Sequence, residues 1–170
     1  MMKSINYILF GIFGMIVLTS CEKKDYPKGV EAMEHHYYAV FVPNNNTGVS
    51  VNKNQTALIK FPVQFYSTFI RGYDAVARYA VVKTGITNPA VVGVDFNIVD
   101  KNGVVIPSAD STYSMVFPQA KQATDTIYIK LLNNPAAGTR KIEIQMMENK
   151  TTQFYVDIFS TAFRRPLEIK

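Results

Sequence analysis

The sequence of 170 residues has one cysteine, two histidines and no tryptophan. A single cysteine excludes an internal disulfide framework, and two histidines leave too few ligands for a zinc site of the usual composition. Charged residues are also few, at 18%, and the net charge of +5 is too small and too dispersed to indicate nucleic-acid binding. Hydrophobic residues make up 48% of the chain. The chain can therefore bury a core, and its length fits one domain with a short extension.

The cysteine follows an apolar segment near the N-terminus. Lys3 precedes an apolar run over residues 7–17, which is shorter than the ~20 residues that a membrane-spanning helix needs. The junction before Cys21 resembles the lipobox of bacterial lipoproteins, in which a peptidase cleaves before a cysteine that carries a diacylglyceryl thioether. The lipobox positions are Leu18, Thr19 and Ser20.

We therefore expect residues 1–20 to be a cleaved lipoprotein signal peptide, rather than an ordinary signal peptide or an uncleaved anchor. Cys21 would then hold the protein at the outer membrane through its lipid, since two or three acyl chains anchor stably. Residues 21–34 contain charges, a proline and a glycine but no apolar period, which predicts a tether. Whether the protein faces the cell surface or the periplasm stays open, because the acidic residues after Cys21 match a surface-export signal only in part.

Residues 35–170 show the period of two that is typical of half-buried β-strands. Ile129 and Ile144, for example, alternate with polar neighbours and are expected to point inward. Pro62 lies inside one alternating run and indicates an edge strand or a bulge. Residues 164–170 are interpreted as a solvated tail. The eight predicted strands cover residues 37–42, 57–65, 75–83, 96–100, 114–117, 126–131, 141–146 and 154–158.

Turn-forming runs separate these segments, and no helical period is seen after residue 35, so the sequence predicts an antiparallel β-sandwich. Four segments resemble the Calx-β-like, immunoglobulin-type pattern, over about residues 60 to 165: residues 94–98, 115–118, 125–131 and 139–144. This pattern recurs in small Bacteroidetes lipoproteins of the DUF4843 family, which are often encoded near SusC/SusD-type glycan importers. The resemblance implies an immunoglobulin-like sandwich of about eight strands.

The resemblance also implies an accessory binding or scaffold role, in which outer-membrane transporter components or a glycan are the partners. A structural or adhesion-type protein that binds another envelope protein is the alternative. The sequence departs from the pattern at Phe96, where tyrosine is usual, and at residues 120–123, where a glycine is missing. Calcium binding is not implied, since the carboxylate-rich loop pairs of Calx-β domains are not evident.

Metal and cofactor sites are not expected. His35 and His36 are adjacent, so in a strand they point to opposite faces and do not share one ion. Asp95, Asp100 and Asp110 lie nearest the loop around residue 102 and could supply oxygens to calcium. The Asp100 segment is also a good hairpin turn that needs no ion, and the turn is the favoured interpretation.

A catalytic site is not expected either. A serine triad would have to use a histidine at the edge of the domain, and no Gly-x-Ser-x-Gly elbow is present. Two convergent carboxylates of a divergent hydrolase are a minor alternative. The remaining candidates are tyrosines assigned to the outer faces of strands, which either form a ligand-binding surface or pack against neighbours. They are Tyr66, Tyr73, Tyr113, Tyr128 and Tyr155.

Replacement of Cys21 tests the lipobox. We expect Cys21→Ser to abolish incorporation of labelled fatty acid and to move the protein from the membrane fraction to the soluble fraction, because the hydroxyl does not form the thioether. Metabolic labelling with fractionation measures both. Unchanged labelling and membrane partition in this variant would contradict the prediction.

Overall fold

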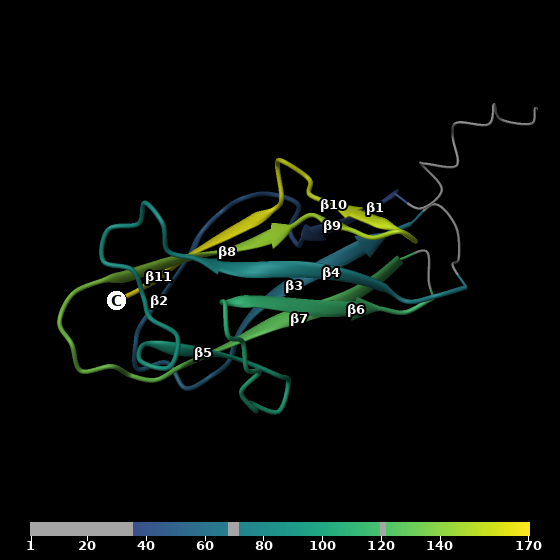
Figure 1. Ribbon diagram of the computed structural model, residues 1–170. Coiled ribbons are helices and arrows are strands. Elements are labelled where there is room, and N and C mark those ends of the chain that lie inside the picture. Colours follow the sequence, from purple (N-terminus) through teal and green to yellow (C-terminus); the bar gives the residue numbers. More distant parts are fainter. Residues whose placement is uncertain (1–35, 68–71, 120–121) are drawn as a thin grey trace, which may run out of the picture. The chain divides into compact units, whose positions relative to one another are not determined.

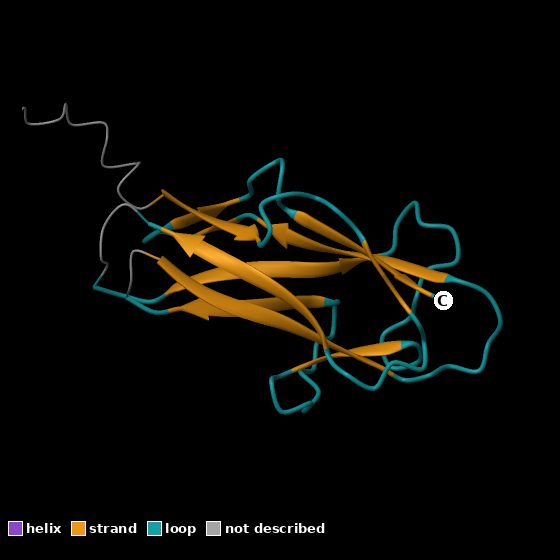
Figure 2. Ribbon diagram, turned by 180° about the vertical axis from the view of Figure 1, so that it is seen from behind, coloured by secondary structure: helices purple, strands orange, loops and turns teal. Residues whose placement is uncertain are grey.

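The computed structural model describes residues 36–67, 72–119 and 122–170, and the signal peptide, Cys21 and tether lie outside these residues. The described residues form eleven strands and no helix, arranged as two sheets that pack face to face (Figures 1 and 2). The predicted β-sandwich is confirmed. No helix of this part of the chain is long and apolar enough to cross a membrane.

The first sheet has six strands in the order β5-β7-β3-β1-β10-β9. Their bounds are β5 Phe96–Val99, β7 Gln122–Leu131, β3 Ile59–Tyr66, β1 His36–Phe41, β10 Tyr155–Asp157 and β9 Asn149–Lys150. The second sheet has five strands in the order β2-β11-β8-β4-β6. Their bounds are β2 Val49–Val51, β11 Arg164–Ile169, β8 Arg140–Met147, β4 Ala75–Val82 and β6 Thr112–Phe117.

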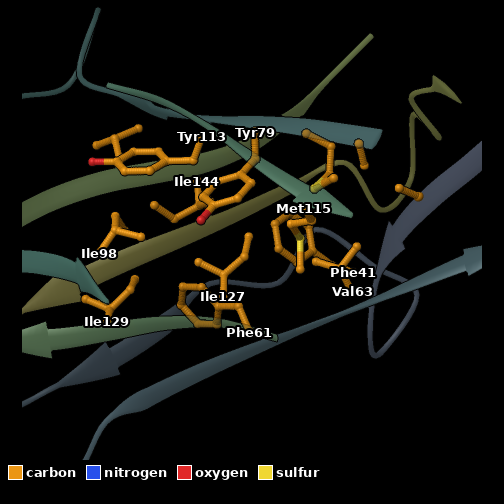
Figure 3. Packing of buried hydrophobic residues seen from close by; sticks show 14 of the residues in the cluster. Phe41, Phe61, Val63, Tyr79, Ile98, Tyr113, Met115, Ile127, Ile129 and Ile144 are labelled. Atoms are coloured by element: carbon orange, nitrogen blue, oxygen red, sulfur yellow. The ribbon is translucent and has the colours of Figure 1, made fainter. Parts of the chain in front are cut away.

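Alternation along the strands builds one core between the two sheets. Ile129 of β7 and Ile144 of β8 are fully buried, as the sequence predicted. Lys130, which follows Ile129 in β7, points to the opposite face and is exposed. Aromatic and aliphatic side chains from both sheets belong to this core, and Figure 3 labels Ile127 from the six-stranded sheet and Tyr79 from the five-stranded sheet. Each buried aliphatic side chain contributes ~1.5–3 kcal/mol relative to exposure, so this core is a main source of the stability of the sandwich.

The C-terminal segment is not a solvated tail, and that prediction was wrong. Residues 164–169 form β11, which pairs antiparallel with β8 and parallel with β2, and Leu167 and Ile169 are buried. Charges and Pro166 hid the strand in the sequence. The nitrogen of Pro166 points away from β8, on the side where β2 begins to pair only at Leu167, so the missing N–H breaks no ladder hydrogen bond.

Arg165 of β11 is only 3% exposed, and its side chain lies on the buried face of the strand. Its Nη1 donates to the carbonyl oxygen and Oδ1 of Asn45, at 2.5 and 2.7 Å, and its Nη2 donates to the carbonyl of Pro43. The guanidinium also lies 5.3 Å from the centre of the Phe41 ring. Burial lowers the pKa of Arg165. These bonds fix the loop between β1 and β2 and satisfy a buried cation without a carboxylate.

Pro62 does not mark an edge strand or a bulge, and this interpretation was also wrong. It lies in β3, which has β7 on one side and β1 on the other. The carbonyl of Pro62 accepts a hydrogen bond from the N–H of Val42, one residue beyond the end of β1. The nitrogen of Pro62 faces the same side, where β1 has ended, so an interior strand tolerates the proline.

Three further strands escaped sequence analysis: β2, β9 and β11. Two of them have three and two residues, too few for a visible alternation. Two of the strand pairs are parallel, β1 with β10 and β11 with β2, in a sandwich that is otherwise antiparallel.

The core assignment gives a stability test. We expect Ile144→Ala to lower the free energy of unfolding by ~2–5 kcal/mol, because it empties a buried aliphatic site, and Lys130→Ala to change it by less than ~0.5 kcal/mol. Urea unfolding followed by circular dichroism measures both values. A larger loss in the Lys130 variant would show that the register is wrong by one residue.

Candidate functional site

The outer face of the six-stranded sheet carries a cluster of aromatic rings over β3, β1 and β10. Strand register sets its layout: Tyr38 of β1 lies opposite Tyr66 of β3 and Asp157 of β10. One step along, His36 lies opposite Tyr155. We call the rings that meet here the aromatic platform, and its members are His36, Tyr38, Tyr66, Tyr155 and Phe159.

The rings of the aromatic platform are ordered by stacking. The His36 imidazole lies 5.1 Å from the Tyr38 ring and 4.7 Å from the Tyr155 ring, at interplanar angles of 26° and 22°. Phe159 meets Tyr38 edge-on, with the centres 5.9 Å apart. These separations lie in the range of favourable aromatic pairs. The platform therefore presents nearly parallel rings in fixed positions.

Polar groups surround the rings. His36 Nε2 lies 3.0 Å from Asp157 Oδ2, and the Lys150 ammonium lies 5.8 Å from the centre of the Tyr155 ring. The Tyr66 hydroxyl donates to the side-chain oxygen of Gln64. The platform thus offers both hydrogen-bond donors and acceptors around an apolar surface.

Tyr155 keeps its proton at neutral pH. Burial raises the pKa of Tyr155 to about 12, and hydrogen bonds to the carboxylates of Glu148 and Asp157 act in the same direction. The phenol hydroxyl therefore remains a donor in the physiological range.

Exposure distinguishes the aromatic platform from ordinary packing. Tyr38 is 36% exposed, Tyr66 43% and Phe159 42%, although large aromatic rings are usually covered. Adjacent exposed rings on one sheet face form an apolar patch of the kind that marks a binding surface. Their chemistry favours stacking and hydrogen bonding with a ligand.

The structure brings together only two of the five tyrosines singled out in the sequence. Tyr66 and Tyr155 belong to the aromatic platform. Tyr128 faces the same side, but it lies opposite Lys60, six residues along β3 from Tyr66, which corresponds to about 20 Å. The tyrosines therefore do not form the single surface that the sequence indicated.

Tyr113 does not face outward, and that assignment was wrong. It is 5% exposed and stacks on Tyr79 at 5.3 Å inside the core (Figure 3). β6 begins at Thr112, so Tyr113 shares the inward parity of Met115. Burial raises the pKa of Tyr113.

Tyr73 is partly buried against the core and also lies outside the aromatic platform. Its ring stacks on Phe154 at 5.8 Å, and its hydroxyl lies 2.7 Å from the hydroxyl of Tyr37. For this residue the structure favours packing.

Sequence analysis missed three members of the aromatic platform: His36 as a stacking ring, Tyr38 and Phe159. The signal for Tyr38 was its alternation with Tyr37 and Ala39, which places it outward. The convergence itself depends on the parallel pairing of residues 36–38 with 155–157, which lie far apart in the sequence. Asp157 reaches His36 only through that pairing.

The candidate metal ligands are not gathered into one site. His35 lies outside the described residues. The carboxylate of Asp100 accepts hydrogen bonds from the N–H groups of Asn102 and Val104, both at 2.8 Å, and that of Asp110 accepts from the N–H of Thr112 at 3.0 Å. Among the described residues, no group of three or more histidine, cysteine, aspartate or glutamate side chains is placed to hold a metal ion.

Asp95 has a separate structural role. It is buried, and its carboxylate accepts hydrogen bonds from the N–H of Val91 at 2.7 Å and the side-chain amide of Asn134 at 2.6 Å. These bonds join two loops at the same end of β5, so the side chain is fully used inside the protein.

A surface groove of about 350 Å³ lies on the other sheet, between β2, β11 and the loop at Ile86. Its charged groups already pair with one another: Lys141 Nζ lies 3.2 Å from Glu168 Oε1, and the hydrogen bonds from Lys141, Lys170 and Ser50 lower the pKa of Glu168. The aromatic platform, with its exposed rings at Tyr38, Tyr66 and Phe159, is therefore the stronger candidate.

No protein-family model matches the chain, and no curated protein matches it significantly. Among solved structures, the chain is similar to the apo form of the Calx CBD1 domain, with 13% identity, 79% of this chain and 97% of that chain covered, and a TM-score of 0.48. It is also similar to the calcium-binding domain CBD12 of CALX1.1, with 12% identity, 78% of this chain and 44% of that chain covered, and a TM-score of 0.39.

A third similar structure is BslA, a bacterial hydrophobin, with 14% identity, 79% of this chain and 90% of that chain covered, and a TM-score of 0.27. Two of these three structures are Calx domains. Identities and TM-scores at this level establish neither a family nor a shared ligand.

The lowered pKa values of Asp100 and Asp110 predict how the stability of the domain depends on pH. Hydrogen bonds from backbone N–H groups lower the pKa of Asp100 and of Asp110 below the ordinary value of 3.8. A carboxylate whose pKa is lower in the folded state stabilises the fold above its unfolded pKa, and this contribution is lost as the pH falls through the folded pKa. We expect the stability that these two carboxylates supply to be fully present above about pH 4 and lost below it.

Thermal unfolding from about pH 6 to about pH 3 measures this effect. The double variant Asp100→Asn, Asp110→Asn should melt at a lower temperature than the wild type at pH 6, and its melting temperature should fall less on acidification. Parallel curves for the two proteins would contradict the assignment.

Proposed function

We propose that the protein is a non-enzymatic, lipid-anchored component of the outer membrane whose β-sandwich binds a ligand through the aromatic platform. The ligand class that fits best is a glycan, and the setting is a SusC/SusD-type glycan-uptake system. The observation that carries the proposal is the pair of exposed rings at Tyr38 and Tyr66 on neighbouring strands. The partly buried rings of His36 and Tyr155 continue from Tyr38 as a nearly parallel stack.

The chemistry of the surface fits a sugar. One face of a pyranose ring carries C–H groups and packs on an aromatic ring, whereas its hydroxyls need donors and acceptors at the edge. Gln64, Asp157 and Lys150 supply such groups around the rings. An apolar surface with a few positioned polar groups is the usual composition of a ligand site.

The cellular setting is supported by the sequence. The lipobox before Cys21 supports the anchor, and the resemblance to Bacteroidetes lipoproteins supports the link with glycan importers. Residues 21–34 span at most ~50 Å when fully extended, so an anchored domain would stay close to a membrane transporter.

Binding to another envelope protein is the second candidate function. Phe159 favours it, because the ring is exposed and phenylalanine is enriched in the cores of protein interfaces. The two functions differ in their dependence on Phe159: a protein interface needs that ring, and a glycan site does not.

Affinity electrophoresis of the domain of residues 35–170 in gels that contain single polysaccharides tests the glycan site. These residues include every described strand and the whole described core, so the domain is expected to fold alone. We expect a retarding polysaccharide to be found, and Tyr38→Ala or Tyr66→Ala to weaken its binding about tenfold or more, equivalent to ~1.4 kcal/mol per tenfold.

Tyr128→Ala is the matched control, since it removes a tyrosine from the same sheet face about 20 Å away. It should leave retardation unchanged. Equal loss of retardation in the control and the platform variants would contradict the site, and the absence of retardation by any polysaccharide would contradict the glycan. In a pull-down from envelope extracts, loss of a bound protein in Phe159→Ala but not in Tyr128→Ala would favour the second function.

A further inference from the structure

The sandwich has four sheet edges, and three of them are short or covered within the described residues. β9 has two residues and β2 has three. Residues 104–106 fold back along β5, where the N–H of Ile106 donates to the carbonyl of Ile98 at 3.0 Å. Short or covered edges are the usual protection against pairing with another chain.

β6 forms the fourth edge and lacks this protection. It has six residues, contains no charged side chain or proline, and pairs on one side only, with β4 (Figure 1). Lysine, proline and bulges are the features that normally block such an edge. An edge strand of this length and composition is a template for β-pairing.

The hydrogen-bonding direction of β6 is fixed by its neighbour. The N–H of Val81 donates to the carbonyl of Ser111 at 3.0 Å, so the residues of odd number in β6 bond to β4. The N–H and carbonyl groups of Thr112, Ser114 and Val116 therefore point away from the sheet.

Two of these three residues, Ser114 and Val116, have open backbone groups, which means an outward N–H and carbonyl with no hydrogen-bond partner within the described residues. The N–H of Thr112 donates to Asp110 Oδ1 at 3.0 Å, and its carbonyl accepts from the Ser108 hydroxyl at 2.9 Å. The backbone groups of Ser114 and Val116 have no such partner within the described residues, and the Val116 side chain is 57% exposed. Pro118, which follows the strand, has no N–H to offer.

We propose that β6 pairs with β6 of a second copy of this chain, antiparallel about a two-fold axis at Met115. In this register, Ser114 faces Val116 of the second copy, and Val116 faces Ser114. Each pair exchanges two N–H···O=C hydrogen bonds, so all four open donors and all four open acceptors of the two strands, two of each per copy, are satisfied. Thr112 then meets Pro118, and neither needs a further bond.

The second copy fits this edge because the open segment is complementary to itself. No charged side chain lies on β6, so the symmetric pairing places no like charges opposite each other. The nearest charge on the outer face of the sheet is Arg78, which lies beside Ser114 on β4. Across the axis, the two Arg78 positions are separated by three strand spacings, about 14 Å, which is beyond the screening length of about 10 Å at 0.1 M salt.

The pairing area is small, because one strand edge contributes it. Interfaces of this kind are weak and transient, so dimerisation is expected at high local concentration rather than in dilute solution. The isologous contact closes on itself, so it gives dimers and not fibres.

Cysteine cross-linking of the domain of residues 35–170 tests the register, since the only native cysteine is Cys21. In the double variant Ser114→Cys, Val116→Cys, each new thiol faces the other position of the second copy at a Cα separation of about 5.5 Å, within disulfide reach. We expect a covalent dimer on mild oxidation. Each single variant should remain monomeric, because identical positions lie diagonally at about 7–8 Å.

Sedimentation equilibrium of variants without added cysteine tests the hydrogen bonds. Ser114→Pro removes one outward N–H and leaves the bonds to β4 in place, so it should weaken dimerisation, whereas Ser114→Ala should not. Equal cross-linking of the single and double variants would overturn the proposed register. A wild-type domain that stays monomeric at millimolar concentration, together with no cross-linking of the double variant, would overturn the dimer.

Discussion

The pairing of β1 between β3 and β10 is the interaction on which both the core and the candidate site depend. Tyr37, Ala39 and Phe41 of this strand enter the core, while His36 and Tyr38 face outward on the alternate positions. Because successive residues of a strand point to opposite faces, one backbone segment positions both sets. The rings of the aromatic platform are therefore held by a strand whose other face is fixed by close packing.

The long strands could be predicted from alternation, whereas their partners could not. The segments that include Ile129 and Ile144 showed a clear period of two, and both side chains are buried as expected. A period of two reports which face a residue occupies and says nothing about the strand that lies beside it. Tyr66 and Tyr155 were correctly placed outward, but their approach to His36 follows from a parallel pair between residues separated by more than 100 positions.

The errors have local physical causes. The segment that includes Arg165 looked solvated because arginine is rarely buried, yet carbonyl oxygens of the loop between β1 and β2 satisfy this guanidinium. Pro62 looked like an edge residue because proline lacks an N–H, but its nitrogen faces the position where β1 has ended. Tyr113 was misplaced because the strand begins two residues earlier than its apolar pattern indicated.

Backbone satisfaction also explains why the loop carboxylates do not resemble a calcium site. Asp95, Asp100 and Asp110 were the plausible oxygen donors, and each accepts main-chain N–H groups of its own loop. A carboxylate that caps a turn in this way is held in an orientation set by the turn, so it is not available to converge with the others on one ion. Sequence proximity to a loop was therefore a poor guide to shared function.

The two proposed surfaces lie on different sheets of the sandwich. The aromatic platform lies on the outer face of the six-stranded sheet, and β6 lies at the edge of the five-stranded sheet. A dimer through β6 would therefore leave both platforms uncovered. Two platforms on one dimer would engage a repeating ligand such as a polysaccharide at two points, and the second contact would form at the effective concentration set by the first, which increases avidity without any new contact. Weak sites on each copy are sufficient in such an arrangement, which is consistent with a platform built from tyrosine and histidine rather than the larger indole of tryptophan.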